Sequence, residues 1–189
     1  MENPNETLDI KHGDIGLVVK TKLINKIVSW FMNLYRKILK LPPRRAYNHC
    51  FLCVNIWGQL YVVEALAKGI TATPYKHTYG GKKNHIIKTP IDPLTKEGGE
   101  EISKIALTTA LENTEYDFLS LFEQIWYILT GKWPGKTGPD AEKRMNCAEA
   151  VADWWDKYKA GTFETPASTN PLEIDLNPNF KLKYDFFPS

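Results

Sequence analysis

The chain has 189 residues, of which 43% are hydrophobic and 24% are charged, and its formal net charge is +2. This length and composition are typical of one globular domain with a buried core and argue against a second domain. Three cysteines are too few for a disulfide framework, and their odd number leaves at least one free thiol, which favours a reducing compartment.

The polar N-terminus, residues 1–13, lacks the apolar segment of a signal peptide. No later apolar run reaches the roughly 18 residues needed to span a bilayer. We therefore expect a cytoplasmic protein that is not exported by a cleavable signal, while delivery by a phage or by cell lysis would also be compatible with this sequence.

Basic charge is concentrated near the N-terminus. No acidic residue occurs between Asp14 and Glu64, whereas this interval contains eight basic ones: Lys20, Lys22, Lys26, Arg36, Lys37, Lys40, Arg44 and Arg45. Such a field could steer an anionic substrate, a polyanion or a membrane surface toward the chain, or could be only the solvated face of a helix. An anionic membrane or lipid contact through Lys20–Arg45 is therefore one expected interaction. Nucleic acid is not expected, because no motif accompanies the basicity.

The N-terminal part predicts a strand followed by a long helix. A turn at Gly13-Asp14 leads into a short buried strand at 15–19. Residues 21–41 predict an amphipathic helix that ends at Pro42-Pro43, because proline cannot continue the hydrogen-bond ladder. Its apolar residues recur at helical spacing: Leu23, Ile24, Ile27, Val28, Phe31, Leu34, Ile38 and Leu41.

The clearest β-signal follows this helix. β-Branched and aromatic runs at 49–57 and 60–66 predict a hairpin, with Gly58-Gln59 as a two-residue turn resembling type II′. Beyond Gly69 the chain is expected to be irregular, broken by glycines and prolines, apart from a short strand at 85–88.

The remaining sequence predicts mainly helices. We expect helices at 103–112 and 119–129, a glycine- and proline-containing loop at 131–140, and a helix from Cys147 to near Gly161. The proline-punctuated tail, about 162–189, is expected to be extended. Strands and helices in this order predict the α+β class.

The most informative stretch is Asn146-Cys147-Ala148-Glu149. Asn146 is a good N-cap residue, and Glu149 can reach back to the backbone N–H of Asn146, so the four residues have the form of a capping box. Cys147 then lies at the first position of a helix, where the helix dipole favours a thiolate and lowers the thiol pKa. The alternative interpretation is a small buried hydrophobic residue.

A nucleophilic thiol needs a base, and the sequence offers four histidines. His12, His77 and His85 are expected at the surface, whereas His49 begins a strand and directly follows Asn48. With Gly58-Gln59 as the turn, Glu64 shares a sheet face with His49 but lies four residues away, roughly 13 Å along an ideal strand. A direct contact would then need a bulge or strong twist.

The order of these elements resembles the circularly permuted NlpC-type papain-like cysteine peptidases, the YiiX/YebB-like group. The resemblance implies that Cys147 is the nucleophile, His49 the catalytic histidine and Glu64 the third polar residue of a catalytic triad. Tyr116-Asp117 and Thr165-Pro166-Ala167 also resemble family positions. Serine commonly follows the cysteine in that family, where this chain has alanine.

The resemblance also implies an architecture. We expect one permuted papain-like hydrolase domain over residues 1–189, in which a central antiparallel sheet or small barrel packs against the nucleophile helix. An additional helix and loop would occupy about 119–144. Besides the triad, the expected supporting or substrate-binding residues are Tyr116, Asp117, Asn48 and Asn146.

The resulting functional hypothesis is a thiol protease or amidase that cleaves an amide bond in a peptide, such as a cell-wall peptide, or in a small acyl-amide substrate. Two alternatives remain: a lipid-directed acyltransferase or hydrolase at a membrane surface, and a non-catalytic binding module, for example phage-borne, that retains the fold. No cofactor is expected.

A zinc site or a redox motif at Cys50-x-x-Cys53 is disfavoured, because a strand directs these two side chains to opposite faces. We therefore expect no metal.

Overall fold

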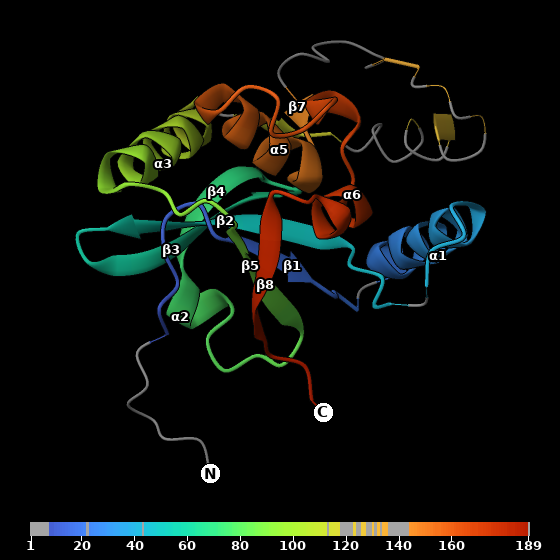
Figure 1. Cartoon of the computed structure of the whole chain (residues 1–189), viewed down its shortest axis with the longest axis horizontal. Helices are drawn as coiled ribbons and strands as arrows, with labels where there is room; N and C mark the ends of the chain where they lie inside the picture. The colour runs from blue at the N-terminus through green and yellow to red at the C-terminus, as the bar shows by residue number, and fades with distance from the viewer. Residues whose placement is uncertain are drawn as a thin grey trace.

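The structure is a computed structural model that describes residues 8–21, 23–42, 44–112, 114–117 and 144–188, together with a few isolated residues between 118 and 143. Its centre is an antiparallel six-stranded sheet with the strand order β4-β3-β2-β1-β5-β8 (Figure 1). The strands are β1 (Ile15–Val18), β2 (His49–Ile56), β3 (Gln59–Leu66), β4 (Gly69–Pro74), β5 (His85–Pro90) and β8 (Phe180–Asp185). This confirms the α+β class and the antiparallel sheet.

Helices cover both faces of the sheet. The helices are α1 (Leu23–Ile38), α2 (Tyr75–Thr78), α3 (Lys96–Leu111), α5 (Cys147–Tyr158), η2 (Pro166–Ser168, a 3₁₀ turn) and α6 (Pro171–Leu176). In Figure 1, α3 and α5 lie over one face, α2 lies under the other, and α1 lies beside the sheet. A short parallel pair, β6 (Glu115–Tyr116) and β7 (Arg144–Met145), leads directly into α5.

Two apolar layers hold this arrangement together, one on each face of β2. Leu52 and Val54 contribute to the layer beneath α5, whereas Phe51 and Cys53 contribute to the layer that includes α2. The alternation follows from the two-residue period of a strand. A side chain at Gly16 would meet the Phe51 ring at 2.0–2.3 Å, so the neighbouring strand is glycine where the ring crosses it.

The hairpin between β2 and β3 turns one residue earlier than the sequence suggested. Ile56 pairs with Gln59, and the turn residues Trp57 and Gly58 have φ values of +50° and +78°, as in a type I′ turn. The predicted turn at Gly58-Gln59 is therefore wrong. The pairing shifts by two residues along β3, so that Leu52 faces Val63.

Three other expectations also need correction. The region after Gly69 is not irregular but forms β4 and α2, because β4 completes the sheet against β3. The tail is not simply extended, since it contains η2, α6 and β8, the last paired with β5. His85 is not at the surface: it lies on a central strand, where its ring stacks on Phe186 at 4.5 Å and its Nε2 contacts the Tyr75 hydroxyl at 2.8 Å.

The predicted helix at 119–129 and most of the 119–144 insertion lie outside the described residues. Among the residues that the structure does describe, helices are too short or too polar to cross a membrane.

Candidate active site

Cys147 lies at the first turn of α5, and the predicted capping box is confirmed. The backbone N–H groups of Ala148 and Glu149 donate to Asn146 Oδ1 at 2.9 and 3.0 Å, and the Asn146 N–H donates to Glu149 Oε2 at 3.4 Å. The cap fixes where the helix begins, and hence where the thiol projects. Cys147 is buried, with 5% of its surface exposed.

The chain immediately before Cys147 is held by the expected supporting residues Tyr116 and Asp117. Strand β6 pairs with β7, the Asp117 N–H donates to the Met145 carbonyl at 3.1 Å, and the Arg144 guanidinium lies 3.8 Å from the Asp117 carboxylate. Burial, followed by the charge of the Cys147 thiolate, raises the pKa of Tyr116. Tyr116 therefore lies within the electrostatic field of the thiol.

His49 and Glu64 are in direct contact, although the sequence suggested that a distortion would be needed. His49 Nε2 lies 2.5 Å from Glu64 Oε2, and both residues are buried. The shifted register explains the contact: one residue beyond the Leu52–Val63 pair, Glu64 lies opposite Phe51, only two residues from His49. Such diagonal neighbours are within reach of long side chains.

Two further groups donate to the same Glu64 oxygen. The Tyr79 hydroxyl lies 2.9 Å away and the Lys20 ammonium lies 3.4 Å away. Burial opposes the charge on this carboxylate, but His49, Lys20 and Tyr79 together outweigh it and lower the pKa of Glu64 to about 2. Glu64 is therefore an anion at neutral pH and can orient the His49 ring.

Asn48 fixes the start of β2. Its side-chain oxygen accepts the Lys20 N–H at 2.8 Å, and its amide nitrogen donates to the Lys20 carbonyl and to Ser29 Oγ, both at 2.8 Å. Asn48 thereby links the strand that carries His49 to helix α1.

The Cys147 thiol is surrounded by groups that favour its ionised form. A hydrogen bond from the Cys50 thiol lowers the pKa of Cys147 most; burial opposes this, and the charge and hydrogen bond of His49 reinforce it. The result is a pKa well below that of an ordinary thiol. For His49, burial lowers the pKa, but the Cys147 thiolate and then Glu64 outweigh it and raise the pKa overall. The two shifts favour a thiolate–imidazolium pair.

The sequence did not identify Lys20, Tyr79 or Cys50 as site residues. Lys20 and Tyr79 come from segments far from Glu64 in the chain, and no local motif marks them. Cys50 could have been found from strand alternation, because it shares the α5 side of β2 with Leu52, whereas Cys53 contributes to the opposite layer. The predicted separation of Cys50 and Cys53 onto opposite faces is confirmed.

The arrangement of the antiparallel sheet and its helices is a YiiX-like α+β fold. The crystal structure of YiiX from Escherichia coli O157:H7, described as a metalloprotein (DUF1105), is similar to this chain with a TM-score of 0.67 and 14% sequence identity, covering 94% of this chain and 98% of YiiX. No protein-family model matches the chain, and no curated protein matches its sequence.

A metal does not fit the arrangement seen here. Within the described residues, no group of three or more His, Cys, Asp or Glu side chains is placed to hold an ion. The His49 Nε2 is engaged by Glu64, and a metal bound through this nitrogen would have to displace that contact.

Proposed function

We propose that this chain is a papain-like cysteine hydrolase of the permuted NlpC type that cleaves an amide bond. The observation that carries the proposal is the position of His49: its Nε2 lies 2.5 Å from the Glu64 carboxylate, and the Cys147 thiolate is near enough to outweigh burial and raise the pKa of the ring. A histidine between a thiol and an acid is the arrangement that nucleophilic acyl transfer requires.

The reaction would proceed in two halves. The Cys147 thiolate attacks the amide carbonyl carbon, and His49 gives its proton to the departing amine, which leaves a thioester on Cys147. Water then loses a proton to His49 and attacks the thioester, which releases the acid and restores the thiolate. Because Nε2 faces Glu64, Nδ1 is the His49 nitrogen that would exchange these protons.

The start of α5 would also stabilise the negative oxygen of the tetrahedral intermediate. The backbone N–H of Cys147 is the first expected donor, because it points from the positive end of the helix. The Asn146 side-chain nitrogen is a second candidate, since it is buried and lacks a partner among the residues the structure describes.

The direct test is alkylation by iodoacetamide at pH 6, read by mass spectrometry for each cysteine. We expect Cys147 to react faster than glutathione, and Cys53 to remain unmodified because its thiol is buried and its pKa is raised. A His49→Gln variant should lose the enhanced rate. If Cys147 reacts no faster than glutathione, the chain is better described as a non-catalytic module.

The substrate class can be tested with electrophilic probes that carry either a peptide or a fatty-acyl chain. A peptide preference would support hydrolysis of a cell-wall or similar peptide. Lipid-directed acyl transfer is the second candidate, favoured by the exposed apolar side chains Ile27, Trp30 and Ile38 of α1, the helix that Asn48 joins to the His49 strand. Preferential labelling of Cys147 by the acyl probe would select that candidate.

A further inference from the structure

Helix α1 has two apolar sides, and the described residues cover only one of them. On its inner side, Met32 is buried together with Leu172 of α6, and Phe31 and Tyr35 pack against this pair. The outer stripe consists of Ile27, Trp30, Leu34 and Ile38, which follow one another at helical spacing. Ile27, Trp30 and Ile38 are 41%, 60% and 50% exposed. The helix is therefore amphipathic in a way that leaves apolar surface in solvent.

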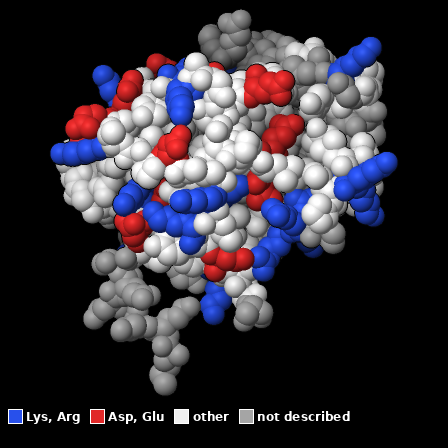
Figure 2. Space-filling view, viewed as in Figure 1, with Lys and Arg blue, Asp and Glu red and all other residues white. Residues whose placement is uncertain are grey.

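Basic side chains border this outer stripe. Lys26, Lys37, Lys40 and Arg44 are all exposed, and none of them forms an ion pair with another described residue. An open hollow of about 580 Å³ lies between the apolar and basic groups; its lining includes Trp30, Leu34, Leu41, Lys37 and Arg44. In Figure 2, blue side chains project on the right, where Figure 1 places α1, and the acidic side chains in this view lie over the centre and left.

On the inner side of α1, by contrast, a basic side chain forms a buried ion pair. Arg36 is buried, and its guanidinium lies 3.5 Å from the Asp175 carboxylate of α6. The basic residues on the outer side have no such acidic partner within the described residues. Among the described residues, therefore, nothing neutralises the charge on this side of α1.

We propose that the outer stripe of α1 docks on an anionic phospholipid bilayer. Lipid phosphates complement the exposed lysines and arginines, while Trp30, Ile27 and Ile38 insert at the headgroup boundary. A protein partner fits less well, because exposed lysines are depleted in protein–protein interfaces, whereas lysines beside an exposed tryptophan are typical of helices that lie on membranes.

Docking in this way would bring the candidate active site close to the bilayer surface. The Ser29 hydroxyl of α1 accepts a hydrogen bond from Asn48, the residue before His49. The proposal does not depend on the chemistry of Cys147, however, so a Cys147→Ser variant should bind lipid as well as the unaltered chain does. This separates failure of docking from failure of the proposed hydrolase activity.

Binding can be measured by co-sedimentation of the full chain with vesicles. We expect binding to vesicles of phosphatidylcholine and phosphatidylglycerol in equal parts, little binding to phosphatidylcholine alone, and weaker binding at high salt. The triple variant Lys26→Glu/Lys37→Glu/Arg44→Glu should bind at least about 100-fold more weakly, because each basic residue near an anionic surface contributes about fivefold.

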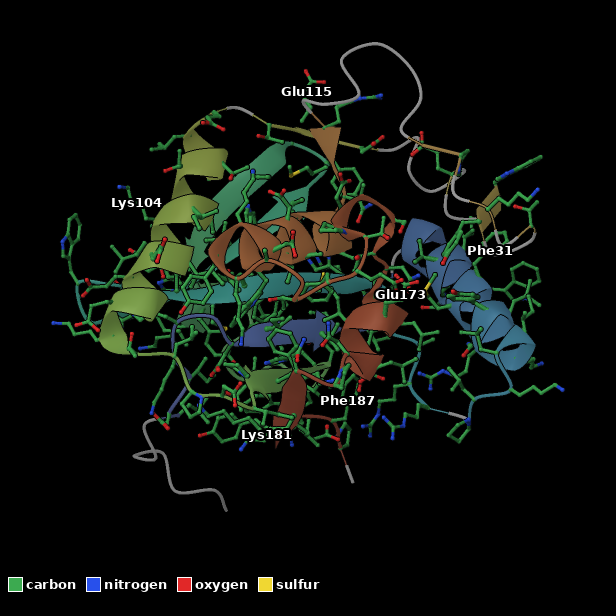
Figure 3. All side chains as sticks on the ribbon, turned by 45° about the horizontal axis from the view of Figure 1, so that its top comes forward. Phe31, Lys104, Glu115, Glu173, Lys181 and Phe187 are labelled. Carbon is green, nitrogen blue, oxygen red and sulfur yellow. The ribbon has the colours of Figure 1, made fainter. Side chains whose placement is uncertain are left out.

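The matched control reverses three exposed lysines away from α1: Lys96→Glu/Lys104→Glu/Lys181→Glu. Figure 3 shows Lys104 and Lys181 far from Phe31, which marks α1. Both triple variants change the net charge equally, so equal loss of binding in both would overturn the proposal and leave only general electrostatic attraction. Equal binding to neutral and anionic vesicles, or none to either, would also overturn it.

Tryptophan fluorescence gives a second, position-specific measurement. Trp30→Phe should abolish the spectral shift on adding anionic vesicles, whereas Trp57→Phe should retain it, although Trp57 at the hairpin turn is 100% exposed. The reverse result would place the contact at the hairpin and overturn the proposal. A dimer in sedimentation analysis that dissociates in Trp30→Ala would overturn it too, because a second copy would then cover the stripe.

Discussion

Helices α1 and α5 are both amphipathic, yet they use their apolar residues differently. In α5, Val151 and Trp154 are fully buried against the sheet and α3. In α1, Trp30 is largely exposed, while Arg36 is buried beside Asp175. The apolar stripe of α5 faces the core, and its buried Glu149 belongs to the cap of the helix. By contrast, α1 keeps one apolar stripe outside and buries Met32 and Arg36 on its other side.

This difference shows that helical periodicity identifies an apolar stripe but not what covers it. The stripe of α5 is covered by the protein itself, which holds Cys147 at a fixed position relative to His49. The outer stripe of α1 remains uncovered by described residues, as expected for a helix whose partner lies outside the chain. Substitutions in the apolar stripe of α5 should therefore reduce stability, whereas substitutions in the outer stripe of α1 should reduce binding.

The largest expected effect is on the free energy of unfolding, and it emerges from a comparison of two tryptophans. Trp154→Ala should reduce the free energy of unfolding by about 3–5 kcal/mol, because it removes a fully buried ring and leaves a cavity. The Trp154 indole N–H also donates to Thr109 Oγ1 at 3.2 Å. Trp30→Ala should change stability by only about 0.5 kcal/mol or less, because that ring is mostly in solvent. Urea unfolding of both variants measures the contrast, and equal losses would contradict it.

The second prediction concerns two carboxylates with opposite pKa shifts. Glu64 belongs to the candidate active site. Its pKa is lowered from 4.5 to about 2, since burial is outweighed by His49, Lys20 and Tyr79. Glu173 of α6 faces Tyr35 of α1, and burial raises the pKa of Glu173 from 4.5 to about 7. Between pH 2 and 4.5 the folded chain therefore binds fewer protons at Glu64 than the unfolded chain does. Between pH 4.5 and 7 it binds more protons at Glu173.

The two residues should therefore make stability change with pH in opposite directions. Glu64 stabilises the fold above pH 4.5, and we expect about 3 kcal/mol of that stability to be lost as the pH falls to 2. Glu173 favours the fold below pH 4.5, and about 3 kcal/mol should be lost as the pH rises to 7. Unfolding free energies of Glu64→Gln and Glu173→Gln across this range should each lack one of these slopes. Parallel pH curves for both variants would contradict the assignment.

The parts of the site that depend on local chain geometry could be predicted from the sequence. The capping box needs only four consecutive residues, so the start of α5 at Cys147 was identified correctly. The pattern of β2 and β3 likewise predicted the hairpin. The turn was misplaced by one residue because both Trp57-Gly58 and Gly58-Gln59 contain a glycine able to adopt positive φ. That single residue decides whether Glu64 reaches His49.

The parts that depend on tertiary contacts could not be predicted. Tyr79 and Lys20 meet Glu64 only because the fold brings three separate segments together. Strand β4 has weak apolar alternation and is recognisable mainly from its pairing with β3. His85 is polar in a polar sequence context, yet the sheet buries it between β1 and β8.

The smallest expected effect is on the reactivity of the Cys147 thiol, and it compares the two cysteines of β2. Cys50→Ala should slow alkylation of Cys147 at pH 6 by on the order of tenfold, because a hydrogen bond to a charged acceptor is worth about 1.5–3 kcal/mol. Its loss raises the pKa of Cys147 and moves the rate–pH curve to higher pH. Cys53→Ala also removes a buried thiol, but from the opposite face of β2, so the Cys147 rate should not change. Equal slowing in both variants would mean that loosened packing, and not the Cys50 hydrogen bond, sets the reactivity of Cys147.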